Sequence, residues 1–411
     1  MPAGLYFAVP FCQTRCTYCN FHTSVVSAGL YRPYAEALQR EIVLRAAAEG
    51  TNGPLLGSAA MRGADMRAQN FDTIYFGGGT PSLLEAADLG DVLEAARREL
   101  RVEAREVTLE ADPETITVRK AGEWREAGFN RVSLGAQSFS DRELATAGRM
   151  HRRADIFIAA AALRESGITN ISMDLIAGLP HQTAESWEES LRELIGLRPE
   201  HVSVYLMEID EGSRLGLEVI QGGARYSARD LPSDDAMAAS YERACQELGA
   251  AGYEHYEISN WGLPGFKSRH NLKYWNREAY WGIGAGAHSF DGRVRWANAH
   301  DASAYVAAVS GGGLAEEQRE EVSAQQELEE KIFLGLRKLE GIEFTTLTAG
   351  AHEARLRERV AELREQGLLV VEGDRVRLAP EKVAVSNEVF VELLNAVSEE
   401  RETSAVNRGS R

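Results

Sequence analysis

Short β-rich runs alternate with helical patterns through the first half of this chain, and this order constrains the fold more than any other feature. The β-rich runs occupy residues 5–9, 73–76, 107–109, 131–134, 171–176 and 202–206. Helical segments separate them, for example at 34–46. Such alternation is typical of βαβ units, so the sequence predicts an α/β fold with a parallel sheet.

Residues able to carry chemistry lie at or near the ends of several of these predicted strands. They are Gly77, Gly78, Gly79, Thr80, Glu110, Gln137 and Asp174. In parallel α/β barrels the active groups collect at the carboxyl ends of the strands. The shared placement therefore favours a barrel-like site.

Three cysteines follow the first predicted strand in the spacing C-x₃-C-x₂-C, as Cys12, Cys16 and Cys19. Three thiolates this close suit an iron–sulfur cluster, and a four-iron cluster would keep one iron open for an exchangeable ligand. His22 could instead complete a four-ligand zinc site, which stays an alternative. The fourth cysteine, Cys245, lies in a helical pattern and is expected to be an ordinary buried thiol.

Composition excludes several classes of function. The formal charge of −17 argues against a nucleic-acid binder, which needs a basic surface. No apolar run approaches the roughly 18–20 residues that cross a bilayer. The first residues lack the basic segment of a secretory signal, and reduced thiols fit the cytoplasm, where we expect the protein.

The pattern also predicts how the 411 residues divide. We expect a core barrel, a barrel extension, an acidic linker, a compact C-terminal module and a disordered tail, at 1–235, 236–309, 310–322, 323–398 and 399–411. Residues 50–70 are interpreted as a surface insertion. In the module, a capping box at Ser323 and Gln326 begins the first of two helices, and a hairpin turns at 372–374, which suggests a winged-helix shape.

The residues around these motifs resemble the radical S-adenosylmethionine (SAM) superfamily. The closer resemblance is to the branch that holds the HemN coproporphyrinogen III dehydrogenases and the HemW heme chaperones. The segments that carry it lie at 6–12, 77–80, 109–113, 128–139 and 174–180, and the likeness extends from residue 5 to about 394. It implies a partial (β/α)₆ barrel, similar to a TIM barrel, followed by a winged-helix-like α+β module.

The resemblance also implies roles for individual residues. Cys12, Cys16 and Cys19 would hold a [4Fe–4S] cluster whose open iron binds SAM. The positions that match SAM contacts are Tyr6, Gly78, Gly79, Thr80, Glu110, Gln137, Arg149 and Asp174. Their chemistry is suitable, since Arg149 can grip a carboxylate with its fork of donors and Asp174 can accept from ribose hydroxyls. One departure is Ala8, where the family often has histidine.

Three features favour the chaperone branch. Phe21 stands where HemN proteins usually carry another cysteine, only eleven residues precede Cys12, and residues 270–275 match the H-N-x-x-Y-W motif of HemW-like proteins. The dehydrogenase is the alternative. Whether SAM is cleaved is not visible in the sequence.

A heme site would need aromatic walls and an iron ligand. The resemblance places heme handling at His270, Asn271, Tyr274 and Trp275, within an aromatic-rich stretch. It implies heme as ligand, heme-acceptor proteins at the membrane as partners, and a homodimer. The sequence identifies neither the electron donor nor the axial ligand.

Overall fold

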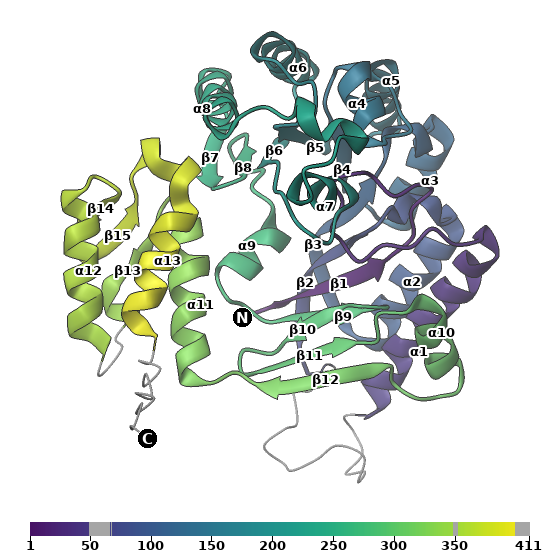
Figure 1. Ribbon diagram of the computed structural model, residues 1–411. Coiled ribbons are helices and arrows are strands. Elements are labelled where there is room, and N and C mark those ends of the chain that lie inside the picture. Colours follow the sequence, from purple (N-terminus) through teal and green to yellow (C-terminus); the bar gives the residue numbers. More distant parts are fainter. Residues whose placement is uncertain (49–65, 67, 348–351, 399–411) are drawn as a thin grey trace, which may run out of the picture. The chain divides into compact units, whose positions relative to one another are not determined.

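The computed structural model describes residues 1–48, 66, 68–347 and 352–398. The chain forms two compact units, Met1–Val322 and Ser323–Arg411 (Figure 1). Most of the predicted insertion at 50–70 and all of the predicted tail at 399–411 lie outside the described residues. Within those residues, every helix is too short or too polar to span a membrane.

Six adjacent parallel strands form the centre of the first unit. In chain order they are β1 (Ala3–Val9), β2 (Asn70–Gly78), β3 (Arg101–Ala111), β4 (Arg131–Gln137), β5 (Asn170–Ala177) and β6 (His201–Leu206). Each contains one of the predicted runs and is longer than that run. The predicted parallel α/β arrangement is confirmed, because each strand pairs in parallel with the next.

Helices connect these strands on the outward face of the sheet. They are α1 (Tyr31–Ala48), α2 (Ala86–Glu99), α3 (Val118–Ala127), α4 (Asp141–Ala147), α5 (Arg153–Glu165) and α6 (Ala184–Leu197). Two further helices, α7 (Arg214–Ile220) and α8 (Asp234–Ala250), follow β6. On the outward face, Phe7 stacks on Phe76 with ring centroids 4.5 Å apart, and Phe76 meets Phe129 edge-on at 5.3 Å. Cys245 lies in α8 as predicted, but it is half-buried.

The opposite face of the sheet carries polar side chains and is called the inner face. On it, Tyr75 of β2 donates a hydrogen bond to Glu110 of β3, at 2.8 Å. The six adjacent parallel strands are the arrangement predicted for a partial barrel.

Further strands extend both edges of this sheet. On one side are β9 (Tyr280–Ile283), β10 (His288–Phe290), β11 (Val294–Asn298) and β12 (Glu316–Glu321), and on the other β8 (Asn260–Gly262) and β7 (Glu254–Glu257). Two helices complete the unit, α9 (Arg269–Trp275) and α10 (Ala302–Ser310). In Figure 1, α9 lies beside β1 and β2, which it contacts.

The range predicted as a linker, 310–322, contains strand β12, which pairs with β11. Its acidic sequence is compatible with a strand because Arg319 offsets the charge. Arg319 pairs with Glu316 at 2.6 Å and lies 4.8 Å over the ring of Trp296. A charged edge strand also discourages pairing with other chains.

In its described residues, the second unit combines three α-helices with a small sheet. Its elements are α11 (Ala324–Arg337), β13 (Ile342–Glu343), α12 (Glu353–Glu365), β14 (Leu369–Glu372), β15 (Arg375–Leu378) and α13 (Ser386–Val397). The predicted capping box at Ser323 and Gln326 is present, and the predicted hairpin turns at Gly373 with a φ of 63°. Helix α13 was not predicted.

Candidate functional site

The cysteine loop directly follows β1 and is held by backbone hydrogen bonds. The Cys12 N–H donates to the Ser24 carbonyl at 3.1 Å, and the Ser24 N–H donates to the Pro10 carbonyl at 2.7 Å. In the middle of the loop, the Thr17 N–H donates to the carbonyl of Ala147 at the end of α4, at 2.9 Å. The Thr17 carbonyl accepts from Leu215 at the start of α7, at 2.8 Å. Two helices therefore fix the loop.

The three thiols of this loop are partly buried. Burial raises the pKa of the Cys12 thiol to about 11, while the hydroxyls of Thr80 and Thr23 act in the opposite direction. Burial likewise raises the pKa of Cys19. A thiolate needs nearby positive charge in such a place, and bound iron supplies it. Among the described residues, no group of three or more His, Cys, Asp or Glu side chains could hold a single metal ion.

The glycines at the end of β2 pack against the cysteine loop. The Gly79 N–H donates to the Val9 carbonyl at 2.9 Å, and the Thr80 N–H donates to the Phe11 carbonyl at 2.7 Å. A Cβ on Gly79 would lie 2.5 Å from the Phe11 carbonyl oxygen, and Gly78 has a φ of 115°. The family resemblance places Gly78 and Gly79 among the positions that contact SAM, where the absence of a side chain lets the backbone approach a ligand closely. Contact with the loop backbone is a second reason for glycine at position 79.

A polar cluster connects the thiols to the strand ends. Arg149, just after α4, donates from Nη1 to Cys16 Sγ at 3.6 Å and from Nη2 to the Gly135 carbonyl at 3.0 Å. It also forms an ion pair with Asp112. Asp112 in turn accepts from the Thr80 hydroxyl at 3.1 Å.

Asp112 is a site residue that sequence reasoning missed. Its position just beyond β3, two residues after Glu110, could have indicated it, because strand ends meet at one rim. Its role is visible only once Arg149 and Thr80 are brought to it by tertiary packing.

Two carboxyl groups face the inner side of the sheet. Glu110 accepts from the Tyr75 hydroxyl at 2.8 Å and from the Gly78 N–H at 3.1 Å. Burial raises its pKa to about 7 despite these donors. Burial raises the pKa of Asp174 to about 6, and its buried Oδ1 has no hydrogen-bond partner. An unpaired buried acceptor is the kind of atom that a ligand hydroxyl satisfies.

The other predicted SAM positions lie near these groups. The Tyr6 ring stacks on Tyr75 with centroids 6.0 Å apart. Gln137, the last residue of β4, has a φ of 65°. A Cβ on Gly135 would lie 3.0 Å from Gln137 Nε2 and 3.1 Å from Arg149 Nη2, so these two side chains are neighbours.

The H-N-x-x-Y-W residues lie in and next to α9, toward the start of β1. A Cβ on Gly4 would be 2.9 Å from the His270 ring, and Gly4 is roughly 17 Å along the strand from Val9, where the cysteine loop begins. His270 is 1% exposed. Its Nδ1 is paired with the Thr73 hydroxyl and its Nε2 with the Tyr274 hydroxyl, both at 2.9 Å.

Burial also lowers the pKa of His270 to about 3. The Ser268 hydroxyl caps α9 by accepting from the Asn271 N–H, and Trp275 lies edge-on to Tyr274. In this conformation both His270 nitrogens are occupied by the protein. The role of these residues in heme handling stays a prediction.

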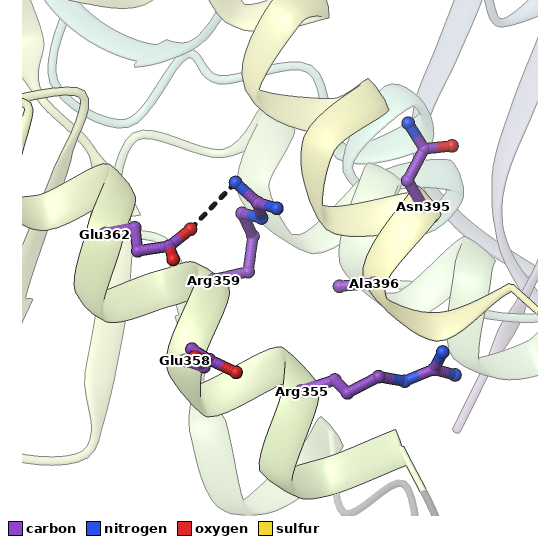
Figure 2. Close-up of a pocket in the computed structure, with 6 residues that line it drawn as sticks. All are labelled: Arg355, Glu358, Arg359, Glu362, Asn395 and Ala396. Carbon is purple, nitrogen blue, oxygen red and sulfur yellow. Dashed lines mark ion pairs between the residues drawn. The ribbon is translucent and has the colours of Figure 1, made fainter.

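The surface cavities among the described residues include the following two. One, of about 380 Å³, is lined by α4 and the residues after it, including Arg149 and His151. The other, of about 230 Å³, lies between α12 and α13 of the second unit, and Figure 2 shows its lining. There Arg359 pairs with Glu362 at 2.8 Å, so charges within the lining already neutralise one another.

Comparison with known proteins gives consistent matches. Residues 6–194 match the Radical SAM superfamily, and residues 322–382 match the HemN C-terminal domain. The chain is 32% identical to the heme chaperone HemW of Bacillus subtilis, over 94% of this chain and 97% of that protein. It is 35% identical to HemW of Mycobacterium tuberculosis, over 92% of this chain and 91% of that protein.

Among solved structures, the coproporphyrinogen III oxidase HemN from Escherichia coli matches with a TM-score of 0.77. The match covers 95% of this chain and 90% of that one, at 22% identity, and therefore speaks for the fold alone. The sequence matches extend over nearly the whole chain, and they place the cysteine loop and the strand ends within the radical SAM domain. The chain belongs to the HemW family of radical SAM proteins.

Proposed function

We propose that this protein is a heme chaperone, which binds heme and delivers it to acceptor proteins while carrying a SAM-binding [4Fe–4S] cluster. The observation that carries the proposal is the near full-length similarity to HemW proteins of several bacteria, at 32–35% identity. Similarity of this extent includes both the radical SAM domain and the C-terminal domain.

The cysteine loop has the features that a cluster site needs. Cys12, Cys16 and Cys19 would be the ligands, and each is half-buried in a loop fixed by two helices. Thr80 and Arg149 direct donors at the sulfurs of Cys12 and Cys16, at 3.8 and 3.6 Å. When bound, the cluster supplies one-electron chemistry to SAM.

The inner rim offers complementary groups for SAM. Arg149, oriented by Asp112, would take the carboxylate, and Glu110 would accept from the ammonium. Asp174 would accept from a ribose hydroxyl through its unpaired Oδ1. Tyr6, Gln137 and the segment 78–80 would line the same ligand.

The chaperone is favoured over the dehydrogenase by the residue at position 21. Phe21 replaces the additional cysteine expected of HemN proteins, and its side chain is 69% exposed beside the cysteine loop. The likeness to the HemN structure, at 22% identity, concerns the fold and does not favour the dehydrogenase.

The experiment is to reconstitute the cluster anaerobically, add hemin, and separate bound from free hemin by gel filtration. We expect about one heme retained per chain, transfer of that heme to the apo form of a heme protein, and no conversion of coproporphyrinogen III. Repeated turnover of coproporphyrinogen III to protoporphyrinogen would overturn the proposal that the protein is a heme chaperone. The Cys16→Ala variant, which lacks one cluster ligand, shows whether retention and transfer depend on the cluster.

Three further features belong to the same proposal. We place the protein in the cytoplasm, where cysteine ligands stay reduced. We expect the acceptors to include respiratory proteins of the membrane, which cross-linking in membrane fractions tests. We also expect a homodimer, which light scattering of the reconstituted protein tests.

A further inference from the structure

The nine histidines of the chain differ in whether their rings could bind a heme iron. Six are buried or half-buried and have at least one ring nitrogen engaged by the protein, namely His151, His181, His201, His255, His270 and His352. The other three, His22, His288 and His300, are exposed. They come from the cysteine loop, from β10 and from the segment after β11.

These three histidines gather at one place on the first unit. The rings of His22 and His300 meet edge-on with centroids 4.6 Å apart. Both lie over Gly286, where a Cβ would be 3.2 Å from His22 Cδ2 and 3.3 Å from His300 Nδ1. His288 lies opposite Ala297 in the antiparallel pair of β10 and β11, and Ala297 is three residues before His300.

The ring of His22 is fixed in one tautomer. Its Nε2 lies 2.6 Å from the backbone carbonyl oxygen of His300. A carbonyl can only accept, so Nε2 carries the hydrogen and Nδ1 keeps a lone pair. Metal-binding histidines are commonly oriented in this way, because a hydrogen bond from the second nitrogen fixes the ring and raises the basicity of the first.

The surroundings of His22 suit a flat apolar ligand that carries carboxylates. Phe21 and Val25 flank it in the same loop and are 69% and 60% exposed. Arg295 lies on β11, which pairs with β10, the strand of His288, and would provide positive charge for a propionate. We propose that His22 is an axial ligand of the heme iron, binding through Nδ1 while the His300 carbonyl holds the ring. This inference rests on the proposed heme binding.

The assignment brings heme and cluster to the same loop. Thr23, the residue after His22, hydrogen-bonds the thiols of Cys12 and Cys19. A heme iron on His22 would therefore be attached three residues from a cluster ligand. His270, at the other end of β1, lies in a different part of the barrel.

The test is a hemin titration of the wild-type protein and of His22→Ala, followed by the Soret band and by electron paramagnetic resonance of the ferric form. We expect His22→Ala to bind hemin at least tenfold more weakly and to lose the signature of nitrogen ligation. Added imidazole should restore that signature by replacing the missing ring. His181→Ala is the matched control, a histidine of the same unit outside the group, and should behave as wild type. Circular dichroism establishes that each variant is folded.

The possible results separate the two proposals. If the wild-type protein retains no hemin, the proposed function fails, and the ligand assignment fails with it. If the wild type retains hemin and His22→Ala shows the same affinity and spectrum, the assignment is overturned while heme binding stands. Loss of the signature in His270→Gln but not in His22→Ala would likewise overturn it.

Discussion

Replacing Glu110 by glutamine should stabilise the cluster-free protein above neutral pH. Burial raises the pKa of this carboxyl from 4.5 to about 7, so the folded state binds a proton that the unfolded chain releases between these values. Stability from this group is therefore fully present below pH 4.5 and is lost as the pH rises through 7. Glutamine resembles the protonated carboxyl in shape but cannot ionise.

The size of the effect follows from the two pKa values. Each pH unit between 4.5 and about 7 corresponds to about 1.4 kcal/mol, which gives roughly 3 kcal/mol for the whole interval. Because Glu110 is partly exposed, solvent screening reduces this to about 2 kcal/mol. The hydrogen bonds from Tyr75 and Gly78 oppose the rise and are already included in the folded pKa.

The measurement is urea unfolding of both proteins from pH 4.5 to 8.5, followed by tryptophan fluorescence. We expect the two curves of stability against pH to meet near pH 4.5 and to separate by about 2 kcal/mol at pH 8, with the glutamine variant more stable. Glu126→Gln, on the exposed side of α3, is the control and should follow the wild type. Parallel curves for wild type and Glu110→Gln would refute the reasoning.

Three other substitutions test the site. Gly79→Ala forces a Cβ to within 2.5 Å of a loop carbonyl and should cost about 1–3 kcal/mol in urea unfolding, whereas Gly122→Ala, in open space on α3, should be neutral or stabilising. Arg149→Lys keeps the positive charge but loses the forked pair of guanidinium donors. SAM should therefore bind roughly ten- to a hundredfold more weakly to the reconstituted protein in anaerobic calorimetry. An unchanged SAM affinity would show that Arg149 is not a ligand contact. Cys16→Ala should lose the brown colour and the iron of the reconstituted protein, and Cys245→Ala should keep both; iron retained in the first variant would contradict ligation by Cys16.

The sequence predicts the parallel sheet because that information is local. Six runs with strand character recur between helical segments, and all six are strands of the structure. The same pattern predicts where the candidate site residues lie, because the carboxyl ends of parallel strands meet at one rim of the sheet. For this reason the amino-acid pattern alone is enough to group Glu110, Asp174 and the glycine segment.

Features that depend on distant partners could not be predicted in this way. Asp112 gains its role from Arg149, 37 residues away. Strand β12 looks like a linker until Arg319 is seen against Trp296. The meeting of His22 with His300, 278 residues apart, leaves no local pattern in the sequence.

The anchoring of the cysteine loop has a consequence for the repair of a damaged iron–sulfur cluster. The hydrogen bonds that Thr17 donates to Ala147 at the end of α4 and accepts from Leu215 at the start of α7 belong to the protein scaffold and need no iron. When oxygen destroys the iron–sulfur cluster, the cysteine loop should therefore keep its conformation. Reassembly would then require only iron, sulfide and electrons, without refolding of the chain, so one polypeptide could pass through several cycles of damage and reloading.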